Sequence, residues 1–395
     1  MKRNLLRLCV LVLAASMLLT SCSAKTVETA RTDNWSSNYK YVFVHGLAGW
    51  GSYDSQNKYL KYWGLSSGDL LDYLNGQGYD CYAASVDPYG SAWDRACELY
   101  AQLTGGVVDY GKEHSERCNH ERYGADYSEN PLITGWSAEN KINLIGHSFG
   151  GATIRLLAEL MANGSADESS ATPADELSPL FTGGKADWIY SITCLASPHN
   201  GTSAYEVNDG STDVSGELSF AERIMSEMVN SSTQGETDGR ADYDYANYDL
   251  HIDNAHALNE GISTLPNVYY FSVPCSSCVQ RSDLSYAPDR DITEKMFVKS
   301  SILMGVGNGT TAGGFEFDYS WQDNDGLVNT ISATAPFNAP SQEFDKASIT
   351  AGVWNVLPVF KGDHLSITGG MMIKTDVSEF YSELMGTINS INSNV

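Results

Sequence analysis

Three observations predict an α/β protein with a mostly parallel central sheet covered by helices on both faces. Short apolar, β-branched runs alternate along the chain with segments of helical spacing. Apolar residues make up 42% of the 395 residues, which is enough to build one large domain or two modest ones. A single serine also stands between an apolar strand and a helix, in the stretch KINLIGHSFGGATIRLLAEL (141–160).

The elements follow one another in a regular order. Residues 39–46 are β-branched and aromatic and stop at a glycine, so they form a strand. Residues 70–86 end a helix at Gly76–Gly78 and continue as a strand, and residues 91–106 form a helix that ends at two glycines. The remaining predicted elements are strands within 141–148, 187–201 and 267–275 and helices at 150–164 and 378–391.

Two stretches interrupt this alternation. Residues 107–136 are rich in histidine, tyrosine and charge. Residues 201–249 are rich in serine, threonine and aspartate, with an apolar-faced segment at 220–229. Long irregular segments in a compact domain are usually functional or disordered, and we expect one or the other here.

The first residues have the features of an export signal. Residues 1–21 have a basic start and an apolar run from Leu8 to Leu19 that is short for a membrane-spanning helix. The ending LTSC (19–22) resembles a bacterial lipobox, which predicts cleavage before Cys22, acylation of Cys22 and a polar tether over 22–38. An ordinary signal peptide with an incidental cysteine is the alternative. We expect an exported protein, lipid-anchored at the bacterial cell surface or extracellular.

Charge and cysteine content narrow the function further. The formal net charge of −25 argues against nucleic-acid binding, because a phosphate backbone would be repelled. Six cysteines remain after Cys22 and show no regular disulfide framework. Cys275 and Cys278 form a lone CxxC, which fits a redox pair, half a zinc site or two unrelated thiols. Without a second CxxC or an adjacent histidine, unrelated thiols are favoured.

The serine at position 148 has the setting of a catalytic nucleophile. Gly146 and Gly150 stand two residues before and two after it, where side chains would collide in a sharp strand-to-helix turn. Such a G-x-S-x-G turn raises the hydroxyl above the edge of the sheet and directs the positive end of the next helix toward it. A glycine-rich turn with a structural serine is the alternative.

A nucleophilic serine needs a base held by an acid, in the chain order serine, acid, histidine. Among the histidines after Ser148, only His364 follows the last predicted core strand, so His364 is the expected base. Spacing alone does not select the acid among the carboxylates between 274 and 364. Asp325 is favoured because its Asn-Asp-Gly turn precedes an apolar pair and would hold it rigidly, and Asp323 is the runner-up.

Two backbone N–H groups are expected to form an oxyanion hole. One belongs to Phe149, which follows the nucleophile, and the other to Leu47, in the loop after the strand at 39–46. Because both groups act through the backbone, their side chains are free to vary.

Several blocks together resemble the secreted bacterial lipases of the staphylococcal and thermoalkalophilic Bacillus (Geobacillus) type. They are VFVHGLAGWG, SAWDRACELYAQLTGG, VDYG, INLIGHSFGG, LSPLFTGG, CLASPHNGT, NDGLVNT and GDHL, in this order from about residue 41 to 365. The resemblance implies an α/β-hydrolase fold over 39–395 and hydrolysis of lipid esters. It also points to Ser148, Asp325 and His364 as a catalytic triad.

The resemblance further implies a structural zinc site in a small extra lobe at about 92–130. Its ligands would be Asp94, His114, His120 and Asp244, with Asp242 as the runner-up for the fourth. Imidazole and carboxylate ligands suit tetrahedral Zn²⁺. Without the resemblance, two histidines in a polar loop would more often be ordinary surface residues.

Two other features of these lipases are changed here. Their calcium site has carboxylates where this chain has Ser366 and Met371, so we expect this particular calcium site to be absent. A lid-like insertion is expected at about 201–245, with Ala221, Ile224, Met225 and Met228 on one apolar helical face. An ordinary surface helix is the alternative for that segment.

The sequence thus predicts a serine lipase or esterase that acts on triacylglycerol-like substrates through an acyl-enzyme. A phospholipase or a short-chain carboxylesterase with the same triad is the nearest alternative. A non-catalytic surface lipoprotein is the alternative from another class, and an intact candidate triad argues against it.

Overall fold

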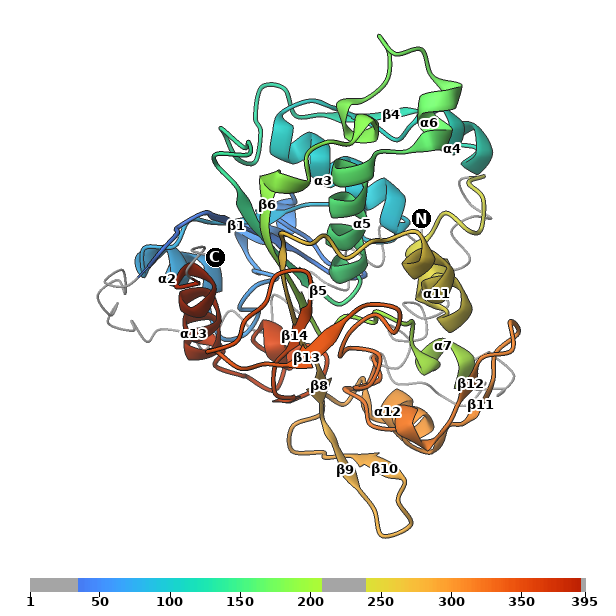
Figure 1. Cartoon of the computed structure of the whole chain (residues 1–395). Helices are drawn as coiled ribbons and strands as arrows, with labels where there is room; N and C mark the ends of the chain where they lie inside the picture. Colours follow the sequence, from blue (N-terminus) through green and yellow to red (C-terminus); the bar gives the residue numbers. More distant parts are fainter. Residues whose placement is uncertain (1–34, 208–238, 392–395) are drawn as a thin grey trace.

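The computed structural model describes residues 35–207 and 239–391, and a seven-stranded sheet forms its centre (Figure 1). Each pair of neighbouring strands is parallel. The strand order is β13 (Ser341–Glu343), β14 (Trp354–Val356), β7 (Tyr269–Val273), β6 (Ile189–Leu195), β5 (Ile142–His147), β1 (Lys40–Val44) and β2 (Cys81–Ala84). Because β5 and β6 are central, all of their residues are buried, as expected for a sheet covered on both faces.

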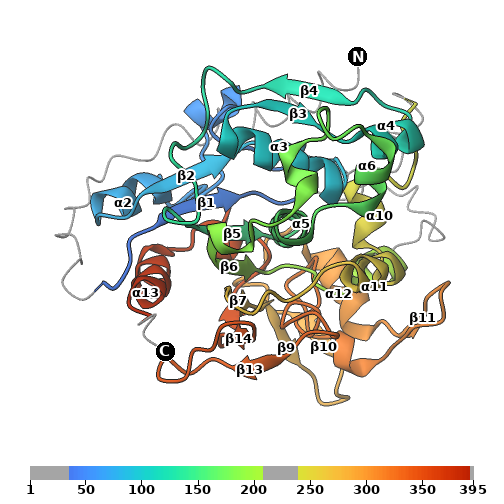
Figure 2. The same ribbon diagram turned by 45° about the horizontal axis from the view of Figure 1, so that its top comes forward.

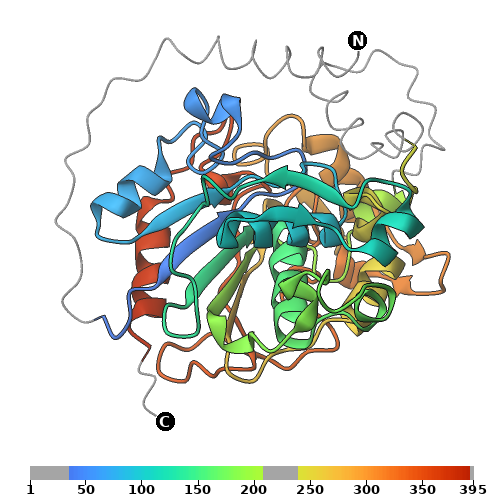
Figure 3. The ribbon, with the colours of Figure 1, turned by 90° about the horizontal axis from the view of Figure 1, so that it is seen from above.

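Alternate residues of β1 enter two separate hydrophobic cores. Val42 and Val44 pack with α3 (Ala92–Thr104) and α5 (Gly150–Asn163) on one face of the sheet. Tyr41 and Phe43 pack with α2 (Leu70–Gly76) and α13 (Ser378–Asn389) on the other. Figure 3 shows α5 and α13 on opposite sides of the strands.

The two helices of the first face have clear ends. The Ser91 side chain accepts the N–H of Asp94 at the start of α3, and Gly105 ends that helix in the left-handed conformation. Helix α5 starts directly after the turn at Ser148 and ends at Gly164. On α5 the side chains of Ile154, Leu157, Ala158 and Met161 are all buried, as their spacing predicted.

Smaller elements surround this layered core. The helices are α4 (Lys112–Cys118), α6 (Ala166–Ala171), α7 (Ser203–Val207), α10 (Ala246–Leu250), α11 (Ile252–Glu260) and α12 (Val298–Val306). Two-stranded pairs form from β3 (Val107–Asp109) with β4 (Tyr123–Asp126), β9 (Cys278–Gln280) with β10 (Tyr286–Pro288), β11 (Gly309–Thr310) with β12 (Glu316–Phe317), and β15 (Phe360–Lys361) with β8 (Cys275–Ser276). Figure 2 shows β3 and β4 alongside α3, with α4 at their end.

The irregular stretches prove to contain short regular elements. Residues 107–136 form β3, α4 and β4, and the described part of 201–249 contains α7 and α10. The export signal, Cys22, most of the tether and the apolar face at 221–228 lie outside the described residues. Within residues 35–207 and 239–391, no helix is both long enough and apolar enough to cross a bilayer.

Candidate functional site

The turn after β5 gives Ser148 an unusual backbone conformation. Its φ is 55°, in the left-handed region that non-glycine residues avoid. A Cβ on Gly146 would lie 2.5 Å from the carbonyl carbon of Gly150, and one on Gly150 would lie 2.3 Å from the carbonyl oxygen of Val44. The prediction that close chain approach requires both glycines is therefore confirmed.

The loop after β1 passes directly over the serine. A Cβ on Gly46 would lie 2.6 Å from Ser148 Cβ, so only glycine allows this approach. Val86 donates its N–H to Nε2 of His45, which leaves Nδ1 of this neutral imidazole to donate to the Gly46 carbonyl at 2.9 Å. Burial and the Arg95 charge lower the pKa of His45 to about 3, so the ring stays neutral.

Fixing the Gly46 carbonyl also fixes the N–H of Leu47, because both belong to one planar trans peptide. The Arg95 guanidinium donates to the same carbonyl at 3.4 Å and also to the His45 carbonyl. Phe149, at the start of α5, is buried, and the Arg95 guanidinium lies 5.1 Å from its ring centre. The two loops that carry the expected oxyanion donors therefore share one buried arginine.

His364 and Asp325 form a buried pair. His364 Nδ1 donates to Asp325 Oδ2 at 2.8 Å, and the His364 N–H donates to the Asp325 carbonyl at 2.9 Å. Asp325 Oδ1 accepts the N–H groups of Leu327 (3.0 Å) and Val328 (2.8 Å), which locks the carboxylate in the tight turn. The Nδ1 bond leaves His364 Nε2 as the acceptor of the neutral ring.

The other candidates for acid and base lie elsewhere. Asp323, the runner-up acid, accepts the Ser276 hydroxyl at 2.6 Å instead of a histidine. His199 is buried against Trp354, with its ring centre 4.6 Å from the indole. His251 lies 3.1 Å from a carboxylate oxygen of Glu206. The structure therefore places Asp325, rather than Asp323, beside His364.

His147 brings the serine and histidine segments together. It directly precedes Ser148, and its Nε2 lies 2.8 Å from the His364 carbonyl oxygen. The two imidazole rings lie 4.8 Å apart between centres. Among the described residues no hydrogen bond joins Ser148 Oγ to His364, a link that is often long in ligand-free enzymes.

A second cluster joins the start of α3, helix α4 and the segment before α10. His114 Nε2 lies 3.0 Å from Asp94 Oδ1 and 3.2 Å from Asp244 Oδ1. His120 Nε2 lies 3.4 Å from Asp244 Oδ2 and 3.7 Å from Asp94 Oδ1. The structure therefore brings the four predicted ligands together, and Asp242, the runner-up, is exposed.

The chemistry of this cluster fits a bound cation. His120 Nδ1 donates to the Glu121 carbonyl at 2.8 Å, so Nε2 of the neutral ring carries a lone pair and no proton. This Nε2 and Asp244 Oδ2 are both buried and without a hydrogen-bond partner, although they face each other. Two acceptors that face each other favour a bound cation between them, and the Arg240 Nε also lies 3.8 Å from Asp244 Oδ2.

Cys118 is a further buried group at this cluster. His114, Cys118, His120 and Asp244 together could bind a metal ion, a set that differs from the predicted one at one position. The Cys118 sulfur lies 3.8 Å from Nδ1 of His114, the ring nitrogen that does not face the aspartates. Nε2 of His114 faces both aspartates, and the Arg240 guanidinium lies 3.1 Å from Asp94 Oδ2.

The loop after His364 is held by two carboxylates. Asp363 Oδ1 accepts the N–H groups of Leu365 and Ser366 as well as the Ser366 hydroxyl. Glu294 Oε1 accepts three successive N–H groups, those of residues 371–373. The Glu294 N–H in turn donates to Asp363 Oδ2 at 2.6 Å. Ser366 and Met371 stand where the resembling lipases have calcium ligands, and here both residues donate hydrogen bonds to these two carboxylates.

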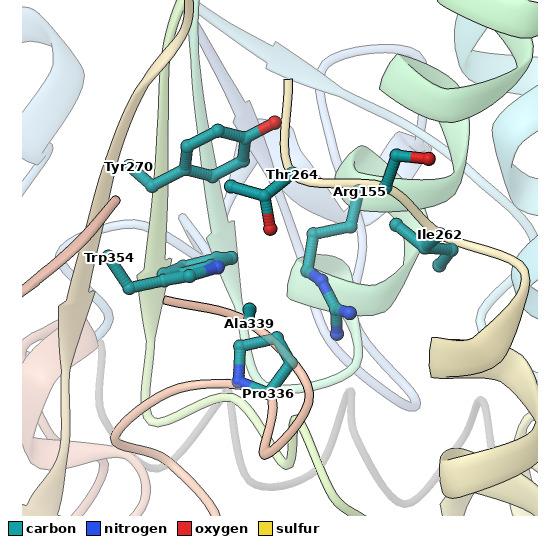
Figure 4. A pocket seen from close by; sticks show the side chains of 8 residues that line it. Arg155, Ile262, Thr264, Tyr270, Pro336, Ala339 and Trp354 are labelled. Carbon is teal, nitrogen blue, oxygen red and sulfur yellow. The ribbon is translucent and has the colours of Figure 1, made fainter. Parts of the chain in front are cut away.

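A small pocket elsewhere contains a buried cation. Arg155 on α5 lines it with Tyr270, Trp354 and the segment 262–264, and its guanidinium points into the space between them (Figure 4). Arg155 donates to Asn259 at 2.5 Å and lies 5.9 Å from the Trp354 ring centre. Ser148, Asp325 and His364 do not line this pocket.

The parallel sheet, with a serine on the sharp turn between a central strand and its helix, defines the α/β-hydrolase fold. The family described as "Lipase-like, C-terminal domain" matches residues 37–234 and 234–392. The chain therefore belongs to this lipase family of staphylococcal type. The predicted α/β-hydrolase fold and the predicted family are both confirmed.

Known relatives agree with this assignment. Lipase 2 of Staphylococcus aureus is 34% identical over 362 residues, covering 84% of this chain and 50% of that protein. The chain thus spans about half the length of the curated relatives it matches. EstA from Clostridium botulinum has a TM-score of 0.79 at 29% identity, covering 96% of this chain and 95% of its own. Staphylococcus hyicus lipase has a TM-score of 0.76 at 28% identity, with coverages of 92% and 99%.

Proposed function

We propose that this protein is a serine hydrolase that cleaves carboxylic esters of lipids. The observation that carries the proposal is the left-handed Ser148 at the end of β5, one residue after the histidine that contacts the His364–Asp325 pair. Membership of the lipase family supports the same reaction class.

In the proposed reaction Ser148 Oγ attacks the acyl carbonyl while His364 Nε2 takes its proton. Asp325 stabilises the imidazolium through the 2.8 Å bond to Nδ1. The N–H groups of Leu47 and Phe149 bind the oxyanion, and such donors are typically worth about 3–4 kcal/mol each. His364 then protonates the leaving alcohol, and water activated by His364 cleaves the acyl-enzyme to release the acid.

We also propose that the second cluster holds one Zn²⁺ through Asp94, His114, His120 and Asp244. Nε2 of His120 and Oδ2 of Asp244, two buried atoms that make no hydrogen bond, support this ligand set. With four protein ligands the metal would have a structural role, joining α3, α4 and the segment before α10. Export of the protein and its anchoring through acylated Cys22 remain part of the proposal.

Labelling with a fluorophosphonate probe tests the nucleophile. We expect the probe to label the wild-type protein on Ser148 and to leave the Ser148→Ala variant unlabelled. A wild-type protein that is not labelled, or equal labelling of both proteins, would overturn the proposal.

Asp325→Asn provides a sharper test of the acid. Because Oδ1 accepts the N–H groups of Leu327 and Val328, the new amide nitrogen must face His364 and donate to Nδ1. His364 would then carry its proton on Nε2 and could not act as a base, so kcat should fall by about 10⁴-fold. Asp323→Asn is the matched control, since Asp323 binds Ser276, and it should retain activity within about threefold.

The substrate class needs its own measurement. Hydrolysis rates on triacylglycerols of increasing chain length, on short-chain esters and on phospholipids would separate a lipase from an esterase or a phospholipase. Preference for long-chain triacylglycerols is the expected result, and preference for phospholipids would contradict it.

A further inference from the structure

Tyr62 and His147 form a buried chain of hydrogen bonds between two segments of the proposed site. Tyr62 Oη lies 3.0 Å from the Gly46 nitrogen and 2.6 Å from His147 Nδ1. His147 Nε2 lies 2.8 Å from the His364 carbonyl oxygen. This chain of hydrogen bonds therefore runs from the loop that carries Leu47, past the serine turn, to the loop that carries the expected base.

The direction of every bond in this chain follows from its two ends. The His364 carbonyl can only accept, so His147 Nε2 must carry the proton. Nδ1 of the neutral ring is then an acceptor, and the Tyr62 hydroxyl must donate to it. The tyrosine oxygen is left to accept the Gly46 N–H, which can only donate. With a neutral His147 ring, each member thus has one role, and no other arrangement of protons satisfies all three bonds.

The surroundings of Tyr62 and His147 keep these hydrogen bonds in the directions just described. His147 is 1% exposed and Tyr62 is 5% exposed. Burial and the proximity of His364 hold the pKa of His147 well below its usual range, so the ring is neutral. Trp63 packs edge-on against both rings, with centres 5.3 Å from Tyr62 and 6.3 Å from His147. Loss of any one hydroxyl or ring nitrogen would leave a buried polar partner unsatisfied.

We propose that Tyr62 and His147 are positioning residues that couple the oxyanion loop at Gly46–Leu47 to the base loop at His364. The proposal rests on the function proposed above. His147 adjoins the nucleophile, so its bond to the His364 carbonyl sets where the base lies relative to Ser148. The Tyr62 bond to the Gly46 N–H sets where the oxyanion loop lies relative to the same turn. A shift of about 1 Å between such groups can cost about a hundredfold in rate.

Tyr62→Phe removes the central hydroxyl and nothing else. We expect kcat to fall between about tenfold and a hundredfold while KM changes by less than about twofold, because the groups that move act on the transition state. Tyr79→Phe is the matched control: Tyr79 is 4% exposed and donates to the Ser382 carbonyl at 3.0 Å, in the core beside α13. The control should lose comparable stability and keep its kcat.

A double-mutant cycle with His147→Gln tests whether the two residues act through one chain. We expect the combined loss in kcat to be no larger than that of the more damaging single variant. Independent, additive losses would contradict the coupling, as would an unchanged kcat in the folded Tyr62→Phe variant.

The tautomer of His147 can be measured in the wild-type protein without any variant that must fold. Nitrogen-15 NMR of histidine-labelled protein should show a neutral ring protonated on Nε2 throughout the pH range in which activity is measured. A ring protonated on Nδ1, or a positively charged ring, would overturn the proposal. This measurement also separates the two proposals, because it stands even if the wild-type protein cleaves no ester.

Discussion

At Ser148 the backbone adopts a strained, left-handed conformation that the tight packing around it maintains. The residue has φ of 55°, and the chains around it approach within distances that exclude a side chain at Gly46, Gly146 and Gly150. Such conformations cost on the order of 1–3 kcal/mol and persist where packing imposes them. The strain therefore lies at the proposed nucleophile, where the surrounding packing fixes the position of the backbone.

Gly150→Ala tests this packing. The new Cβ would lie 2.3 Å from the Val44 carbonyl oxygen at the end of β1, so backbone must move. We expect the free energy of unfolding to fall by about 2–4 kcal/mol in urea titrations. Gly106→Ala is the control, since its Cβ would meet only one atom, at 4.0 Å, and a loss of equal size there would contradict the argument.

The raised pKa of Glu98 predicts that the free energy of unfolding depends on pH. Burial and the nearby Asp87 charge raise the pKa of Glu98 from 4.5 to about 8. The folded protein therefore keeps a proton that the unfolded chain releases above pH 4.5, and stability falls as pH rises to about 8. In Glu98→Gln this titration is absent.

The corresponding measurement compares urea unfolding of wild type and Glu98→Gln at pH 5 and pH 9 in zinc-containing buffer. Between these two values wild type should lose on the order of 4 kcal/mol more than the variant. Parallel losses in the two proteins would show that Glu98 does not titrate in this window.

At the scale of elements, long and strongly patterned segments were predictable and short ones were not. The helices α3 and α5 were predicted from apolar spacing and terminal glycines. Helix α4 and strand β14 have seven and three residues, too few for either periodicity to show. Their structure depends on contacts with distant segments, such as the pairing of β14 with β7.

The same distinction applies to the candidate site. The turn at Ser148 could be predicted because a sharp turn needs its glycines within two residues. For the acid, the sequence favoured Asp325 and kept Asp323 as the runner-up, because the choice depends on which turn residue faces His364. Tyr62 carried no local signal, since its partner His147 lies 85 residues further along the chain.

Metal removal should act on the lobe around α4. A chelator that binds zinc tightly should lower the midpoint of thermal unfolding by several degrees and release close to one zinc per chain. His114→Ala should contain no zinc and show no further shift. A chelator selective for calcium should leave the midpoint unchanged, and a shift with it would contradict the expected loss of the calcium site.

At the scale of the whole molecule, the proposed lipoprotein signal at residues 1–21 leads us to expect an exported protein that is held at a membrane surface through acylated Cys22. Expressed with its own signal in a bacterium that processes lipoproteins, wild type should partition with membranes and incorporate labelled palmitate. Cys22→Ser should incorporate none. Incorporation of label by this variant, or a wild type found only in the soluble fraction, would contradict acylation at Cys22.

The order of strands has a consequence for the newly made chain. The first strands, β1 and β2, form one edge of the sheet, and β13 and β14, made more than 250 residues later, form the other. The oxyanion loop comes from the early part and His364 from the last. Leu47 and His364 can therefore come together only after the chain has been synthesised beyond β14, so the proposed site forms late in synthesis.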